Sequence, residues 1–195
     1  MAVELGPFSL DRMVRAVTQV RERLLRATSA LERAGMDYAV AGGNAVAAWV
    51  SRVDESAARN TRDVDLLVRR EDFDVVKAAL DGAGFLYRHS TGVVLFSDGL
   101  GAKARDAVHV VFAREFVRPH EPLPNPDVAE SEDAGEFRIL NLQALVQIKL
   151  TAYQDKDRTH LRDLIDVGLI DESWCGRFPP ELAERLKHLI ETPDG

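Results

Sequence analysis

Two aspartates separated by one residue are the part of this sequence best suited to chemistry. Asp63 and Asp65 open a strand-like apolar run that ends at Val68. Successive side chains of a strand point to opposite faces, so both carboxylates are expected on one face and Val64, Leu66 and Val68 on the other. Like charges held side by side repel each other unless a cation neutralises them. A divalent metal ion, Mg²⁺ or Mn²⁺, suits two carboxylates; the alternative is a solvated strand end without function.

A glycine turn upstream of these aspartates has the form of a phosphate-binding site. Residues 38–41 predict a short buried strand, Gly42 and Gly43 a turn, and the next residues an apolar helix from about Asn44. Glycines let the backbone approach a ligand, and a helix start offers unpaired N–H groups and the positive end of its dipole. A turn of this kind about 20 residues before two carboxylates can hold a triphosphate beside its metal ions.

The order of these two motifs resembles the nucleotidyltransferase superfamily of the DNA polymerase beta type. The resemblance rests on Gly42-Gly43 and on Thr61-Arg62-Asp63-Val64-Asp65. It implies the transfer of a nucleoside monophosphate from an NTP to a hydroxyl acceptor, with pyrophosphate as the leaving group. Positioning and charge neutralisation by metal ions would supply the catalysis.

The resemblance also implies a role for each residue of the motifs. Asp63 and Asp65 would be catalytic residues and metal ligands. The implied nucleotide-binding residues are Gly42, Gly43, Asn44, Arg62 and Lys149. Arg59 and Arg62 would steady the nucleotide or, as the alternative, pair with one of the aspartates.

A third carboxylate, which in this superfamily usually serves as general base and metal ligand, is replaced here. The corresponding strand is expected at residues 107–113, where His109 stands at that position. A neutral imidazole accepts a proton near neutral pH, so His109 could act as the catalytic base, but it is a poorer ligand for Mg²⁺ than a carboxylate. Asp106 is the nearest acid and is expected on the opposite face. A histidine packed in the core is the alternative.

Two further motifs lie near the C-terminus. Lys149-Leu150-Thr151-Ala152 fits the Lys-x-x-Ala element of AbiEii-type toxin nucleotidyltransferases, and Arg162-Asp163-Leu164-Ile165-Asp166 is similar to their basic-Asp-x-x-Asp element. This resemblance implies that Lys149 contacts nucleotide phosphate and that Asp163, a further catalytic residue, orients Lys149 or assists the acceptor. It also suggests the toxin of a toxin–antitoxin system. A structural network of ion pairs is the alternative.

Composition places the chain among ordinary globular proteins. It has 195 residues, of which 46% are apolar and 29% charged. The net charge of −7 argues against general binding to DNA. The single cysteine, Cys175, and the lack of a signal or membrane-spanning run predict a cytoplasmic protein. Its expected partners are an NTP donor and a hydroxyl acceptor, which is an RNA such as tRNA, a protein or a small molecule.

Hydrophobic periodicity predicts an α/β (α+β) fold, a mixed sheet with helices packed on one face and a C-terminal helical subdomain. Strands are expected at residues 85–89, 93–96 and 106–112, with a hairpin turn at residues 90–92. Further helices are expected at residues 9–34, 71–83, 140–150, 159–170 and 180–191. The arginine-rich face of the first helix is either solvated or a patch for an anionic acceptor.

These elements divide the chain into three parts. An N-terminal helix with the nucleotidyltransferase core is expected in residues 1–116, an extended surface connection in residues 117–136, and the helical subdomain in residues 137–195. The leading hypothesis is a Mg²⁺-dependent nucleotidyltransferase. A catalytically impaired relative that binds a nucleotide or a protein is the alternative because of His109, and a metal-dependent phosphohydrolase is the third possibility.

Overall fold

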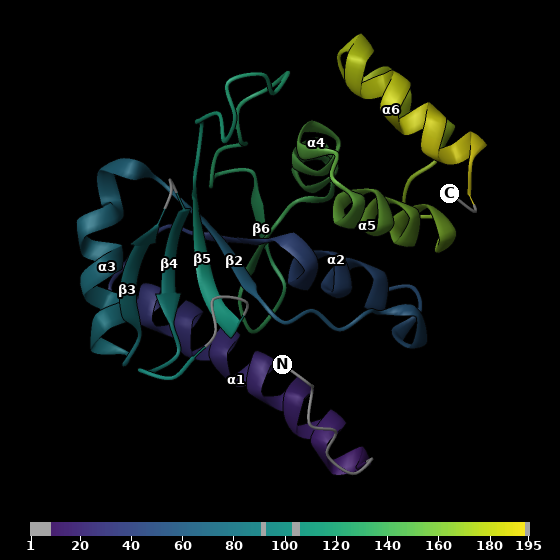
Figure 1. The fold of residues 1–195 in the computed structure, drawn as a ribbon. Coiled ribbons are helices and arrows are strands. Elements are labelled where there is room, and N and C mark those ends of the chain that lie inside the picture. The colour runs from purple at the N-terminus through teal and green to yellow at the C-terminus, as the bar shows by residue number, and fades with distance from the viewer. Residues whose placement is uncertain (1–8, 91–92, 103–105, 194–195) are drawn as a thin grey trace, which may run out of the picture.

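The structure, a computed structural model, describes residues 9–90, 93–102 and 106–193. Its strands are β1 (Ala39–Ala41), β2 (Val64–Val68), β3 (Leu86–Ser90), β4 (Val93–Ser97), β5 (Ala107–Phe112), β6 (Ser131–Asp133) and β7 (Arg138–Leu140). Within the described residues these strands form one sheet in the order β3-β4-β5-β2-β1-β7-β6 (Figure 1).

Strand β2 lies at the centre of the sheet. It pairs antiparallel with β1 and parallel with β5, so the sheet is mixed. In this register Asp65 lies opposite Ala41 on one side and His109 on the other. The apolar positions Val64 and Leu66 are fully buried, as the alternation of the strand predicts.

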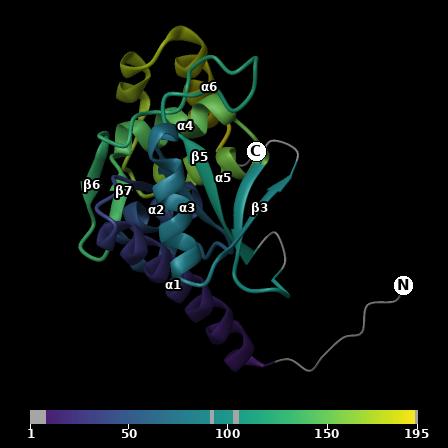
Figure 2. The same ribbon diagram turned by 90° about the vertical axis from the view of Figure 1, so that its left-hand side faces the viewer.

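Helices α1 (Leu10–Arg33) and α3 (Phe73–Gly82) pack against each other on one face of the sheet (Figure 2). Leu31 of α1 and Leu80 of α3 are fully buried. The start of α1 differs from the sequence-based expectation, because its apolar positions before Val20 are exposed; Leu10, for example, is 79% exposed. Only the second half of the helix contributes to the core.

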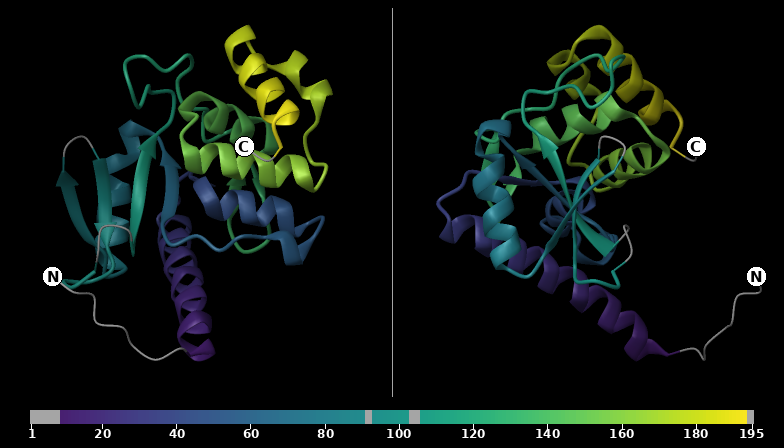
Figure 3. Two further views of the ribbon diagram at one scale, coloured as in Figure 1. Left: turned by 45° about the vertical axis from the view of Figure 1, so that its right-hand side comes forward. Right: turned by 60° about the vertical axis from the view of Figure 1, so that its left-hand side comes forward.

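The C-terminal helices form a second group at the opposite end of the molecule from β3 and β4 (Figure 3). They are α4 (Leu142–Ala152), α5 (Asp155–Asp166) and α6 (Pro180–Glu191). Helix α2 (Gly42–Ser51) contacts both β2 and α5, so it joins the sheet to this group. The candidate site lies at this junction.

The structure confirms the expected fold class, a mixed sheet with helices packed on one face. It differs in the segment predicted as a surface connection, where β6 begins at Ser131 and where Asn125 and Val128 are buried. Strand β7 was also missed; it joins the sheet through the pairing of Val40 with Ile139. Both strands have three residues, too few to show a period-two pattern. The predicted hairpin strands β3 and β4 do pair, while their turn at residues 91–92 lies outside the described residues.

Three arginines of α1 form ion pairs with acidic residues elsewhere in the protein. Arg21 pairs with Glu136, and Arg23 and Arg26 both pair with Asp98. These contacts favour a structural role for this part of the arginine-rich face. Among the helices of the described residues, none combines the length and apolar character that a bilayer crossing requires.

Candidate active site

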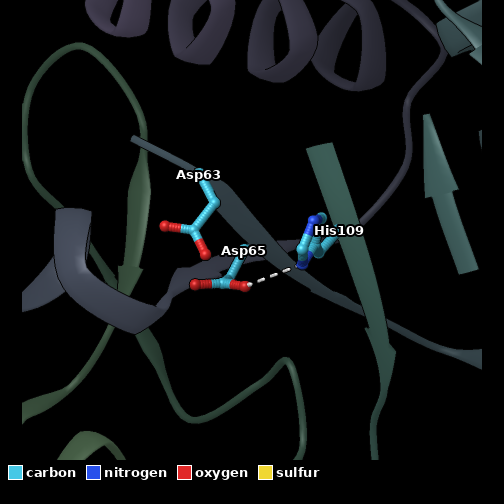
Figure 4. Close-up of side chains that lie close together, drawn as sticks. All are labelled: Asp63, Asp65 and His109. Carbon is cyan, nitrogen blue, oxygen red and sulfur yellow. Dashed lines mark ion pairs between the residues drawn. The ribbon is translucent and has the colours of Figure 1, made fainter. Parts of the chain in front are cut away.

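Asp63, Asp65 and His109 form a cluster at the centre of the sheet. Asp63 directly precedes β2, Asp65 is its second residue, and His109 lies beside Asp65 on β5. One ligand atom from each side chain lies within 4.8 Å of the others. The His109 Nδ1 atom is 3.9 Å from Asp65 Oδ1 (Figure 4). The two strands therefore bring together the two aspartates predicted to share one face and His109, which the resemblance placed at the third position.

The two carboxylates of the cluster have different electrostatic surroundings. Burial raises the pKa of Asp63, but the hydrogen bond that Thr61 Oγ1 donates at 2.9 Å and the charge of Lys156 outweigh burial and leave the pKa below its usual value. Burial and the negative charge of Asp63 raise the pKa of Asp65. Asp65 is therefore the position at which added positive charge would be most stabilising.

The glycine turn is shaped around these acids. Gly42 has φ +65°, and a Cβ atom there would lie 1.8 Å from Asp65 Oδ2. A Cβ atom on Gly43 would lie 2.9 Å from the side chain of Thr61. Asn44 Nδ2 donates a 2.8 Å hydrogen bond to the carbonyl oxygen of Asp63. Three of the five residues predicted to bind the nucleotide thus contact the acidic segment, and the N-terminus of α2 lies beside the cluster.

Lys149 approaches the cluster from α4. It lies with Asp65 and Gly42 along a cavity of about 160 Å³, and its Nζ atom is 3.0 Å from Asp157 Oδ1, with both side chains buried. Asp157, and not Asp163, pairs with Lys149, which contradicts the first of the two roles predicted for Asp163; the second role, assistance to the acceptor, stays a prediction. A buried ion pair holds the ammonium group in a fixed place.

Asp163 contacts Arg59, and Arg62 lies beside α1; the sequence indicated neither contact. Asp163 accepts a 2.7 Å hydrogen bond from Arg59 Nε. Arg59 therefore pairs with this acid and not with Asp63 or Asp65. Arg62 lines a separate cavity beside α1, and its carbonyl oxygen accepts a hydrogen bond from Arg23. The predicted role of Arg62 in nucleotide binding stays a prediction.

A second cavity, of about 250 Å³, lies between α2 and α5. Its walls include Gly43 and Thr61, which border the cluster, and also His160 and Asp163. Lys156 lines both cavities. This lysine was missed because it belongs to no motif; its place beside the acids arises only when α5 packs against α2.

His160 is held in the neutral state by its surroundings. Burial, together with the positive charge of Lys149, lowers its pKa to about 4. Its Nδ1 atom is buried and has no hydrogen-bond partner among the described residues. The cavity between α2 and α5 is therefore lined by a neutral imidazole.

The chemistry of the cluster suits a divalent cation. Two carboxylates and one imidazole supply oxygen and nitrogen donors. Burial and the negative charge of Asp63 raise the pKa of Asp65, and a bound cation would oppose both effects. Carboxylate oxygens favour Mg²⁺ and Mn²⁺, whereas imidazole favours softer transition metals. Asp63, Asp65 and His109 are the residues that would hold such an ion.

Comparisons with known proteins identify the fold. No family model and no curated protein matches the chain. The solution structure of the antibiotic-resistance factor ANT(2″)-Ia matches with a TM-score of 0.53 and 17% identity over 92% of each chain. An H. pylori protein, provisionally assigned as a nucleotidyltransferase, matches with a TM-score of 0.50 and 16% identity over 92% of this chain and 78% of its own. The chain therefore has a nucleotidyltransferase-type fold.

The close approach of Gly42 to Asp65 predicts that Gly42→Ala will impair metal binding. The added methyl group displaces Asp65, so Mn²⁺ affinity should fall by roughly tenfold or more. Gly35→Ala is the matched control, because Gly35 has φ +68° and nothing within 4 Å of its Cβ position. Both variants carry the same backbone strain, and titration calorimetry separates them. Equal Mn²⁺ affinity in the two variants would show that Asp65 does not bind the metal.

The lowered pKa of His160 predicts a loss of stability in acid. In the unfolded chain the imidazole titrates near its ordinary value of 6.5, and in the folded chain near 4. Between these values the unfolded state binds more protons, so stability falls as the pH decreases from about 6.5 to about 4. Urea unfolding over this range should show a weaker pH dependence in His160→Gln. The exposed His120 supplies the control His120→Gln, which should keep the wild-type profile; an unchanged profile in His160→Gln would contradict the assignment.

Proposed function

We propose that this protein is a metal-dependent nucleotidyltransferase that moves a nucleoside monophosphate from an NTP to a hydroxyl acceptor. One observation carries the proposal: Asp63, Asp65 and His109 meet at the start of a glycine-initiated helix in a fold of the nucleotidyltransferase type. The nearby Lys149 and Lys156 add positive charge to the same cleft.

Each group has a task that follows from its position. Lys149, Lys156 and the N-terminus of α2 would bind the triphosphate by charge and hydrogen bonding. Asp63 and Asp65 would hold Mg²⁺ or Mn²⁺, which when bound supplies neutralising charge to the phosphates. His109, at the edge of the cluster, would accept the proton of the attacking hydroxyl.

The proposed reaction is a displacement at the α-phosphorus. The acceptor oxygen forms a bond to this phosphorus while the bond to the bridging oxygen of pyrophosphate breaks. The electron pair of that bond leaves with pyrophosphate, and the hydroxyl proton passes to the imidazole of His109. The part played by the protein is mostly positioning and charge stabilisation.

The acceptor is best sought among small molecules first. The net charge of −7 opposes binding to long nucleic acids. One structural neighbour, matched over 92% of each chain, is an antibiotic-resistance factor, which makes the hydroxyl group of an antibiotic a reasonable first test. The resemblance to AbiEii-type toxins makes tRNA and proteins the next candidates.

The proposed activity predicts metal-dependent transfer of label from an α-labelled NTP to an acceptor, with release of pyrophosphate. Asp65→Asn should lower the rate by about a hundredfold or more, because the charge that holds the metal is removed. Asp74→Asn on the opposite side of the sheet is the control, since Asp74 is exposed on α3. The assay uses a panel of antibiotics that carry hydroxyl groups, tRNA and cell extract. Orthophosphate in place of pyrophosphate would indicate a phosphohydrolase.

His109 favours a second candidate, a nucleotide-binding module without transfer activity, because the superfamily's third carboxylate is absent. If His109 is the base, His109→Ala should lower kcat by about a hundredfold with little change in NTP affinity. His109→Asp, which supplies the missing carboxylate, should keep or raise the rate. Tight NTP binding without turnover in the wild type, but with turnover in His109→Asp, would support the binding module. Equal turnover in all three proteins would exclude His109 as the base.

A further inference from the structure

The cavity between α2 and α5 contains a buried carboxylate oxygen that nothing in the described residues satisfies. The Asp163 side chain is 7% exposed. Its Oδ1 atom is bonded to Arg59, whereas its Oδ2 atom is buried without a hydrogen-bond partner. A buried acceptor without a donor is costly. This oxygen is therefore a place where a ligand would supply a hydrogen-bond donor.

The two walls of this cavity differ in character. On α2 the wall is apolar, made by Val46, Ala47 and Val50. On α5 it is polar, because His160 and Asp163 stand one turn apart and so point the same way. A flat ring with an apolar face and a polar edge matches both walls. Asp163 is paired with Arg59, and its free oxygen only accepts hydrogen bonds, so it suits an N–H group better than a phosphate oxygen. A bare metal ion would find no side-chain ligands on α2.

The position of the cavity connects it to the proposed phosphate site. Gly43 and Thr61 line the cavity and also border the Asp63 cluster, since Thr61 donates a hydrogen bond to Asp63. Lys156, which acts on the charge of Asp63, lines the cavity as well. A molecule whose phosphates lie at the cluster would therefore extend its remaining part between α2 and α5.

We propose that this cavity binds the nucleobase of the donor, and that Asp163 Oδ2 accepts a hydrogen bond from an exocyclic amino group of that base. The proposal rests on the nucleotidyltransferase function given above. Arg59 is a positioning residue, since it holds the other carboxylate oxygen and leaves Oδ2 without a partner among the described residues. The neutral His160 offers a second hydrogen-bonding atom to the ring edge. Asp163 thus selects bases that carry an amino group.

The test compares nucleotides that differ only by that amino group. The pairs are GTP and ITP, ATP and purine riboside triphosphate, and CTP and 2-pyrimidinone riboside triphosphate, each titrated with Mn²⁺ by calorimetry. In the wild type the amino-bearing member of at least one pair should bind about tenfold tighter, as expected for one hydrogen bond to a charged acceptor. In Asp163→Asn and Asp163→Leu the preference should fall to about one, while the other member of that pair keeps its affinity.

The matched control is Asp166→Asn, because Asp166 is exposed on the same helix and should leave the preference unchanged. Circular dichroism establishes that each variant is folded; if Asp163→Leu is not, the wild type and Asp163→Asn decide. Equal binding of both members of every pair in the wild type, or an intact preference in Asp163→Asn, would overturn the inference while leaving the proposed function standing. Failure of every NTP to bind in the presence of Mn²⁺ would overturn both.

Discussion

The repulsion between Asp63 and Asp65 is the constraint on which the rest of the site depends. Two carboxylates on one strand face, partly removed from water, are unfavourable unless hydrogen bonds or cations compensate them. The protein supplies part of this compensation from nearby in the sequence. Thr61 donates to Asp63, and Gly42 leaves room for the Asp65 carboxylate where any side chain would collide with it. The glycine turn is therefore required by the acids themselves, before any phosphate binds.

The remaining compensation comes from far along the chain. Lys149 and Lys156 belong to α4 and α5, and both act on the charge of Asp65. Lys149 forms an ion pair with Asp157, so the position of its ammonium group is fixed before any ligand binds. A fixed cation loses little conformational freedom on binding. The packing of the C-terminal helices against α2 is thus part of the site as well as part of the fold.

The sequence predicted those features that follow from the alternation of side chains along one strand. Alternation along a strand is enough to place Asp63 and Asp65 on one face. His109 was assigned through the resemblance to the superfamily, and the parallel pairing of β2 with β5 places it beside Asp65. The sequence could not show that Asp157 and not Asp163 holds Lys149, because both acids lie near that lysine in sequence and only the packing of α5 against α4 decides between them. Strands of three residues, such as β7, carry no periodic signal at all, and their place depends on pairing with β1.

The order of charged side chains along α5 favours one orientation of a bound nucleotide. Lys156, His160 and Asp163 recur at intervals of four and three residues, which places them along one helix face. The charge along this face changes from positive at the end near Asp63 to negative at the far end, with a neutral imidazole between them. A triphosphate is therefore favoured at Lys156 and disfavoured at Asp163. The reverse orientation would bring phosphates against a buried carboxylate, so the charges of this helix face favour the proposed orientation, with the phosphates at Lys156.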